Sequence, residues 1–363
     1  MTSRERILTA LAHKEPDRCP TYSWLTDGTF AQLERHFGVQ GPDALEAALG
    51  IDRWRGIGLA VRGAEERDEQ IQELIPDEYL RAEGVLVNSY GCVTRVHPDA
   101  TYLEDFLWVP LQEARDPSAI DAYPFETPES IGLNDDTVAE VERLKAEGAV
   151  VTGGVTQPFK IACILRGMEN FMCDLLVDQA IVNRIYDHLY AYATAYGVLL
   201  AKAGVDVVQL FGDIAMQDRL MMSPDTWRQF DKPRLAELIA QVKAANPEVL
   251  MFMHSDGKMD DVIPDLIEVG LDILNPIQPE CQDPVEVKRR WGDDLVLHGT
   301  ISNQRSVPMG TPQEVRDEVR HLLDHCSRDG GLVIGPANVQ LAEFPTENIV
   351  AMYQAISEYY TGG

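Results

Sequence analysis

The sequence predicts an α/β protein built as a single (β/α)8 barrel over residues 1–363, with a β-rich insertion at about residues 71–110. From Asp135 onward, short apolar runs of strand length alternate with longer segments of helical periodicity. Each apolar run ends in a glycine or polar pair, and several of the next helices start at a Ser-Pro, Asp-Pro or Thr-Pro pair. Six such units, with two candidate strands before Asp135, supply the eight strands of a barrel.

The chain before Asp135 contributes the first two strands and the insertion. We expect a helix over residues 3–14, a short extended segment at Cys19–Trp24, helices at Thr29–Phe37 and Pro42–Leu49, and a second strand within Ile51–Ala60. Between Glu73 and Val109 the pattern changes to short strand candidates at Tyr79–Arg81, Val85–Val87 and Cys92–Val96. This change favours a β-rich insertion packed over one end of the main body.

The chain after Asp135 contributes six strands and the helices between them. The predicted strands are Ala149–Thr152, Asp206–Phe211, Val249–Met253, Leu271–Leu274, Leu295–Leu297 and Leu332–Ile334. The predicted helices are Thr137–Glu147, Gln179–Ala203, Pro224–Ala245, Asp260–Val269, Pro284–Trp291, Pro312–Cys326 and Pro345–Tyr360. In a barrel of this kind the carboxyl ends of all strands face one mouth.

The stretch Val249–Gly257 reads V-L-M-F-M-H-S-D-G, and the candidate site is organised around it. Its five apolar residues fit a strand buried on both faces, and His254 and Asp256 follow directly at the carboxyl end. Ligands bind at that end in parallel α/β proteins, which favours a functional role for His254. The structural alternative is that Asp256 or Gly257 caps the next helix.

The other strand ends bring further polar side chains to the same mouth. They are Gln157, Asp213, Asn275, Gln278, Glu280, His298 and Asn338. Histidine and carboxylate side chains on separate strand ends can form a three-ligand site with an open position for Zn2+. Structural alternatives stay open, because Asp213 and Gln278 can bond loop amides and His298 can be a buried, hydrogen-bonded histidine.

The composition excludes some classes of partner. The chain has 31 Lys and Arg residues against 59 Asp and Glu residues, a formal net charge of -28. A protein this acidic repels polyanions, which argues against nucleic acid and anionic membrane surfaces as partners. The first residues fit an amphipathic helix rather than a secretory signal, and no apolar run approaches the roughly 18 residues of a membrane span. We therefore expect a cytoplasmic protein.

Five motifs carry a resemblance to a known family. They are R-E-R-I-L-T-A-L-A-H-K-E-P-D-R at 4–18, L-R-G-M-E-N-F at 165–171, H-S-D-G at 254–257, D-I-L-N-P-I-Q-P at 272–279 and P-T-E-N-I at 345–349. Together they resemble the uroporphyrinogen decarboxylase superfamily over nearly the whole chain. The chain is most similar to the branch of corrinoid-linked methyltransferases and uncharacterised relatives. The resemblance implies the same barrel.

Departures from the family pattern argue against some of its reactions. The true decarboxylases resemble this chain but carry an arginine-rich loop after the first strand, where Tyr22–Gly28 has no arginine and an added Asp27. They also carry a late histidine where this chain has Asn338. Without those cations a polyanionic porphyrinogen is a poor substrate. The similar zinc methyltransferases that methylate coenzyme M use two cysteines at positions that hold Asp256 and Asn338 here, which would make the ligands harder.

The resemblance implies the methyltransferase component of a corrinoid-dependent demethylase system. It would move a methyl group from a small methylated compound to the Co(I) corrinoid of a separate protein. The implied ligands of Zn2+ are His254, Glu280 and His298. The implied catalytic residues are Asp213 and Asp256, and the implied substrate-binding residues are Trp24, Asp27, Gln157, Gln278 and Asn338.

Two other functions stay open from the sequence. One is a carboxy-lyase acting on a tetrapyrrole-type or other carboxylated substrate, with Asp213 stabilising a protonated ring. The other is a barrel that binds a ligand or a corrinoid protein without turnover. The sequence also leaves the oligomeric state open, with a homodimer as one option.

Overall fold

The computed structural model describes residues 1–97 and 100–361, so residues 98 and 99 of the predicted insertion lie outside it. The central element is a curled parallel sheet of seven strands in the order β1-β7-β8-β9-β10-β11-β12. The strands are β1 (Trp54–Ile57), β7 (Val150–Thr156), β8 (Val207–Phe211), β9 (Leu250–His254), β10 (Ile273–Asn275), β11 (Val296–His298) and β12 (Leu332–Val333). All neighbours in this sheet pair in parallel, which confirms the predicted α/β class.

The eighth predicted strand, Cys19–Trp24, runs between β12 and β1 without joining the ladder. Thr21 forms one parallel bridge with Ile334, whose backbone N donates to the carbonyl oxygen of Pro20 at 3.0 Å. On the side of β1, the backbone N of Thr21 donates to Asp52 Oδ2 at 2.9 Å. Pro20 has no backbone N–H to donate. The Asp52 side chain accepts the hydrogen bond from Thr21 that a backbone carbonyl of a neighbouring strand would accept in a continuous ladder. Within the described residues, the parallel sheet therefore has seven strands rather than eight.

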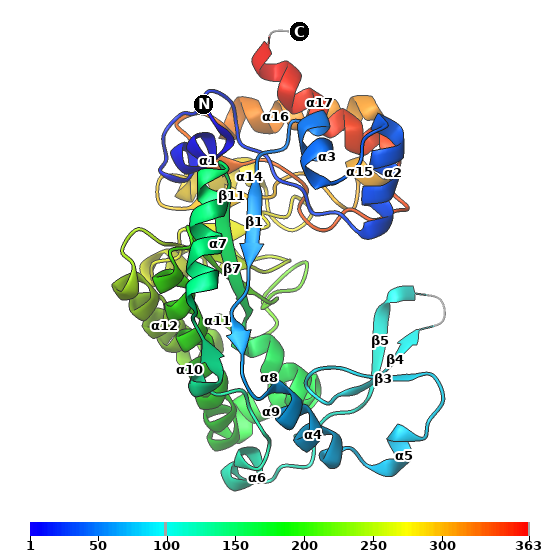
Figure 1. The fold of residues 1–363 in the computed structure, drawn as a ribbon, viewed down its shortest axis with the longest axis vertical. Coiled ribbons are helices and arrows are strands. Elements are labelled where there is room, and N and C mark those ends of the chain that lie inside the picture. Colours follow the sequence, from blue (N-terminus) through cyan, green and yellow to red (C-terminus); the bar gives the residue numbers. More distant parts are fainter. Residues whose placement is uncertain (98–99, 362–363) are drawn as a thin grey trace.

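Helices follow the strands and lie outside the sheet (Figure 1). Those before β7, apart from two near the insertion, are α1 (Ser3–Leu11), α2 (Asp27–Phe37), α3 (Pro42–Leu49), α6 (Pro117–Asp121) and α7 (Asp135–Ala146). Those after β7 are α8 (Pro158–Arg166), α9 (Met168–Val177), α10 (Gln179–Ala203), α11 (Pro224–Phe230), α12 (Lys232–Ala245), α13 (Ile263–Glu268), α14 (Pro284–Trp291), α15 (Ser306–Met309), α16 (Pro312–Cys326) and α17 (Thr346–Thr361). None of the described helices has both the length and the apolar character that crossing a membrane requires.

Helix α1 closes the amino-terminal end of the sheet interior. Ile7 and Leu11 are buried in one cluster with inward-facing strand residues that include Val207 and Val333. The guanidinium of Arg4 adds a hydrogen bond to Asp206 Oδ1 at 2.8 Å. Since apolar side chains fill this end, the carboxyl ends of the strands form the end that carries polar groups.

The insertion is β-rich, as predicted. It contains an antiparallel sheet of β3 (Val85–Val87), β4 (Val93–His97) and β5 (Ala100–Trp108), preceded by α4 (Ala64–Leu74) and α5 (Asp77–Leu80). The strand predicted at Tyr79–Arg81 is wrong, because α5 occupies that position. Figure 1 shows the antiparallel sheet at the end of the molecule away from α16 and α17.

A buried carboxylate lies between α11 and α12. Asp231 accepts hydrogen bonds from the hydroxyl groups of Tyr186 and Tyr190, at 3.0 and 3.2 Å. Burial raises the pKa of Asp231 to about 6, although the two tyrosine hydroxyls favour its charged form. A raised carboxyl pKa means that ionisation of this group works against folding.

We expect Asp231→Asn to stabilise the protein at neutral pH. The penalty of the ionised carboxylate is absent below about pH 4, grows between about pH 4 and 6, and is complete above that range. The amide has a similar volume and no charge, so the free energy of unfolding should rise on the order of 1–3 kcal/mol at neutral pH. Denaturant unfolding of both proteins across this pH range measures the difference. A variant that is less stable than the parent at every pH would contradict the assignment.

Candidate functional site

Three polar side chains stand in a row at the carboxyl ends of β9, β10 and β11. The register pairs Asn275 with His254, and it pairs Leu274 with Leu297, so that His298 comes next to Asn275. Side chains alternate along a strand, and the residues two positions earlier point into the sheet interior. His254, Asn275 and His298 are therefore buried inside the sheet at one level.

The amide of Asn275 sets the tautomers of both histidines. Its Nδ2 lies 3.2 Å from the carbonyl oxygen of His298, which can only accept, and 2.9 Å from His298 Nδ1. Its Oδ1 lies 2.7 Å from His254 Nδ1, so this nitrogen must donate. In the neutral ring of His254 the free lone pair is then on Nε2, while the Nδ1 of His298 is an occupied acceptor. Burial also lowers the pKa of His298 to about 3, which keeps the ring neutral.

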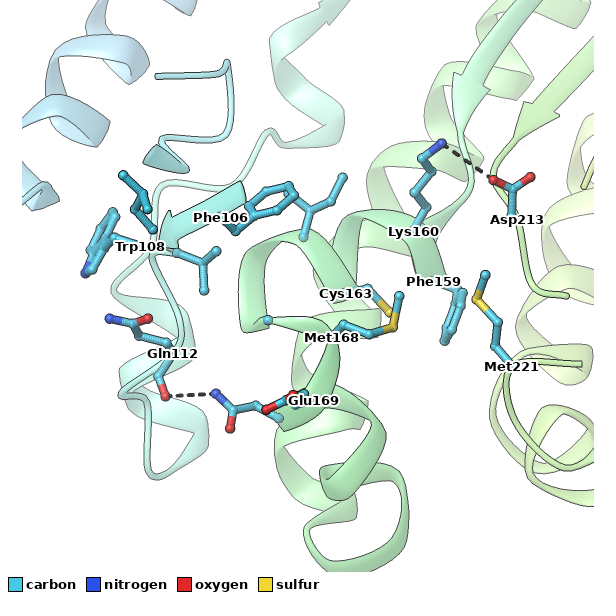
Figure 2. Close-up of a pocket in the computed structure, with 15 residues that line it drawn as sticks. Phe106, Trp108, Gln112, Phe159, Lys160, Cys163, Met168, Glu169, Asp213 and Met221 are labelled. Atoms are coloured by element: carbon cyan, nitrogen blue, oxygen red, sulfur yellow. Dashed lines mark hydrogen bonds and ion pairs between the residues drawn. The ribbon is translucent and has the colours of Figure 1, made fainter. Parts of the chain in front are cut away.

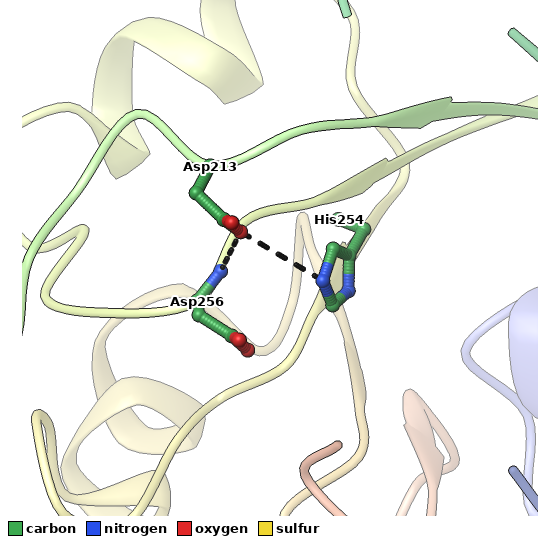
Figure 3. A group of neighbouring side chains, drawn as sticks. All are labelled: Asp213, His254 and Asp256. Carbon is green, nitrogen blue, oxygen red and sulfur yellow. Dashed lines mark hydrogen bonds and ion pairs between the residues drawn. The ribbon is translucent and has the colours of Figure 1, made fainter. Parts of the chain in front are cut away.

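Asp213, His254 and Asp256 bring potential ligand atoms within 4.8 Å of one another. The Nε2 of His254 lies 3.8 Å from Asp213 Oδ1, and the same oxygen accepts a hydrogen bond from the backbone N of Asp256 at 2.9 Å. Figure 3 shows the Asp213 carboxylate between that backbone nitrogen and the imidazole. One imidazole and two carboxylates from the ends of β8 and β9 thus meet at the mouth.

The turn after β9 holds Asp256 in place. The hydroxyl of Ser255 accepts a hydrogen bond from the backbone N of Ile214 at 3.1 Å, which ties this turn to the loop after β8. Gly257 has a φ of 98°, and a Cβ at this position would lie 2.4 Å from the carbonyl oxygen of Met216. Only glycine fits this backbone, so the sequence Asp-Gly fixes the position of the carboxylate.

The Asp213–His254–Asp256 group has potential ligand atoms that are free to bind a divalent metal. The Oδ1 of Asp256 is buried and has no hydrogen-bond partner among the residues that the structure describes. Burial raises the pKa of Asp256, and the negative charge of Asp213 raises it further. The free Nε2 of His254 faces the same space. A bound cation would offset both the unpartnered oxygen and the repulsion between the carboxylates.

Glu280 and His298, the other two predicted ligands, are not in this group. The Oε1 of Glu280 accepts a hydrogen bond from the hydroxyl of Ser302 and lies 3.8 Å from the guanidinium of Arg305. The Nδ1 of His298 is already bonded to Asn275. The structure therefore places Asp213 and Asp256, rather than Glu280 and His298, around His254.

Two of the predicted substrate-binding residues touch the group. The ring of Trp24 packs edge-on against His254, with the ring centres 5.3 Å apart. The Nδ2 of Asn338 donates a hydrogen bond to Asp256 Oδ2. These contacts place both residues beside the ligand atoms.

Among the described residues, the other three predicted substrate-binding residues form no hydrogen bond with the ligand atoms of this group. The Oε1 of Gln278 accepts a hydrogen bond from the backbone N of Gly257 at 3.0 Å and so supports the turn. Gln157 caps α8 by accepting from the backbone N of Lys160 at 3.2 Å. Asp27 is exposed in the first turn of α2 and bonds none of the other predicted site residues in the described part of the chain.

A cavity of about 550 Å³ opens beside Asp213. β5 of the insertion forms one wall, and α8 and α9 form the other (Figure 2). Lys160 lines it, with its Nζ 4.0 Å from Asp213 Oδ2. Lys160 was not among the site residues predicted from the sequence, although its place three residues after Gln157, near the mouth end of β7, could have suggested it.

A second cavity of about 330 Å³ lies inside the sheet. Its aromatic wall is formed by Tyr22, Trp24, Trp54, Phe211 and Phe252. Among the residues that the structure describes, the lining also includes Glu46 and Asp52 but no lysine or arginine. A small cavity without cations suits neither the size nor the charge of a substrate with many carboxylates.

Comparisons with known proteins find relatives among methyltransferases and decarboxylases. A methylcobamide:CoM methyltransferase, MtaA, of Methanosarcina barkeri is 28% identical over 211 residues. That match covers 58% of each chain, so it spans little more than half of the relative's length. A uroporphyrinogen decarboxylase of Chlorobaculum tepidum is 27% identical over 130 residues, which are 36% of this chain and 34% of that protein.

The fold is that of a known methyltransferase structure. A methyltransferase from Methanosarcina mazei superimposes with a TM-score of 0.62 and 20% sequence identity over 99% of both chains. Residues 109–359 match the family described as uroporphyrinogen decarboxylase (URO-D). Because this match covers most of the chain, including every strand from β7 to β12, the protein belongs to the uroporphyrinogen decarboxylase family.

Proposed function

We propose that the protein is the methyltransferase component of a corrinoid-dependent demethylase system. It would move a methyl group from a small methylated compound to the corrinoid of a separate protein. The observation that carries this proposal is the Asp213–His254–Asp256 group at the mouth, in a fold shared with a methyltransferase. The similarity to a methylcobamide:CoM methyltransferase supports a corrinoid as the other reactant.

The group fits Zn2+ as a resident metal. His254 would ligate through Nε2, because Asn275 holds the Nδ1 proton on the other side. Asp256 would ligate through its unpartnered Oδ1, and Asp213 would complete the set. When bound, the metal would act as a Lewis acid toward the oxygen atom that carries the methyl group.

The remaining polar residues would position the carboxylates. Asn338 bonds the second oxygen of Asp256, which leaves only Oδ1 free. Asp213 is held by the backbone N of Asp256 and is about one-third exposed, so it can face both the group and a donor molecule. These contacts restrict the carboxylates before a substrate arrives, which is how a site is preorganised.

The direct test is methyl transfer to free cob(I)alamin, followed by the change in its visible spectrum. We expect the zinc-loaded protein to methylate cob(I)alamin from at least one compound in a panel of methyl ethers, methanol, methylated thiols and methylated amines. We expect no decarboxylation of uroporphyrinogen, because, within the described chain, the inner cavity lining offers no cation and the outer cavity lining offers Lys160 alone to its many carboxylates.

Formation of coproporphyrinogen by the pure protein, with no methyl transfer from any donor, would replace this proposal by the decarboxylase alternative. Failure of both assays with a folded, metal-loaded protein would favour the barrel that binds a ligand without turnover.

A further inference from the structure

The cavity between β5 and the helices α8 and α9 shares a residue with the Asp213–His254–Asp256 group. Asp213 lines this cavity, whereas the cavity inside the sheet has none of the three among its lining residues. Trp24 and Phe211 pack on His254 and belong to the wall of the inner cavity. A molecule in the outer cavity can therefore meet the group directly at Asp213.

Most residues in the wall of the outer cavity are apolar, and three of them carry aromatic rings. Phe106 and Trp108 contribute from β5, and Phe159 contributes from α8. Met168 and Met221 add thioether groups, which make favourable contacts with aromatic rings. The side chain of Phe106 is 50% exposed and that of Met168 is 48% exposed, so their apolar surface is available to a ligand. Such a wall suits a flat aromatic body.

The charged side chains nearest the Asp213–His254–Asp256 group lie at one end of the cavity. The Lys160 Nζ and Asp213 Oδ2 are 4.0 Å apart there, and Figure 2 shows this pair beside Phe159. A lysine ammonium can donate a proton, and a metal held by the neighbouring imidazole and carboxylates would bind an oxygen atom well. This end therefore suits a polar oxygen attached to an apolar body.

We propose that the methyl donor is an aromatic methyl ether, whose ring occupies this cavity and whose methoxy group reaches Asp213. The inference rests on the proposed function and names its substrate class. A volume of about 550 Å³ lies within the range of small-molecule sites. Lys160 is the residue that gives a proton to the departing oxygen.

The reaction balances with these groups. The bond between the methyl carbon and the ether oxygen breaks, and the oxygen keeps its electron pair. The oxygen takes a proton from the Lys160 ammonium and leaves as a phenol, and the lysine regains its proton from solvent. The Co(I) corrinoid supplies both electrons of the new cobalt–carbon bond.

A pair of tryptophan substitutions on α9 tests the location. Met168→Trp puts a large side chain at the cavity wall, whereas Leu176→Trp adds the same side chain at a position that is 75% exposed and outside the lining. We expect Met168→Trp to weaken anisole binding about tenfold or more by calorimetry without corrinoid. Leu176→Trp should bind anisole like the parent. Methyl transfer from methanol to cob(I)alamin by Leu176→Trp, which lies outside the lining, should equal that of the parent.

The leaving group tests Lys160. We expect Lys160→Gln to slow methyl transfer from anisole about 100-fold, because general-acid assistance is lost. Transfer from 4-nitroanisole should slow only a few-fold, since 4-nitrophenolate leaves without a proton. Equal losses for both donors would overturn the role of Lys160 as the acid.

The outcomes separate this inference from the function on which it rests. Transfer from small donors with no anisole binding, or equal effects of the two tryptophan variants, overturns the aromatic-ether site and leaves the methyltransferase proposal standing. Anisole binding that Met168→Trp blocks, without transfer from any donor, overturns the methyltransferase proposal and with it the donor assignment.

Discussion

His254→Asn is expected to lose the metal and methyl transfer while keeping the fold. The Nδ2 of an asparagine lies near the place of the imidazole Nδ1, which is 2.7 Å from Asn275 Oδ1 in the parent protein. The variant can therefore still donate a hydrogen bond to Asn275 Oδ1. Nothing replaces Nε2, which faces Asp213 and Asp256. We expect zinc affinity and methyl transfer to fall about 100-fold or more, with little change in Tm.

His254→Ala is the informative comparison. It removes the same ligand atom and also leaves the buried Oδ1 of Asn275 without its donor, which costs roughly 1–3 kcal/mol of stability. The alanine variant should therefore melt at a lower temperature than the asparagine variant, with equal loss of metal. Elemental analysis and thermal melts on the same preparations measure both. Metal retained in either variant would assign His254 to structure.

Asn275→Leu is expected to damage both the site and the fold. The leucine cannot hold the Nδ1 proton of His254, nor can it donate to the Nδ1 and carbonyl oxygen of His298. Loss of such an orienting partner lowers metal affinity about 10–100-fold. At least two buried groups become unpaired, so the free energy of unfolding should fall by roughly 2–4 kcal/mol. Zinc titration and denaturant unfolding measure the two effects.

Gln340→Leu is the matched control for this change. Gln340 is also a buried amide, but neither its Oε1 nor its Nε2 has a hydrogen-bond partner in the described residues. Replacing an unpartnered buried amide by leucine should leave stability unchanged or raise it. If both leucine variants lose the same stability, the row of His254, Asn275 and His298 has no special role in the fold.

The main features of the site follow from strand ends that are visible in the sequence. Parallel strands bring their carboxyl ends to one edge, which is why Asp213 and Asp256, distant in the chain, meet at His254. The Asp-Gly pair was also informative, because Gly257 adopts a backbone that only glycine accepts easily.

Other features depend on register and loop direction, which the sequence does not encode locally. Asn275 joins two histidines only because β9, β10 and β11 end at the same level. Glu280 lies five residues beyond the end of β10, far enough for its side chain to turn to Ser302. The outer cavity was also not predicted from the sequence. It forms where β5 lies near α8 and α9, and the apolar periodicity of the sequence did not reveal these two helices.

The packing of α1 has a consequence for how the chain folds during synthesis. Ile7 and Leu11 belong to the same core cluster as Val333, near the other end of the chain. The segment that seals the bottom of the barrel is therefore translated long before the strands that receive it exist. Its apolar face cannot be covered completely until β12 has been translated, and closure through such long-range contacts is intrinsically slow.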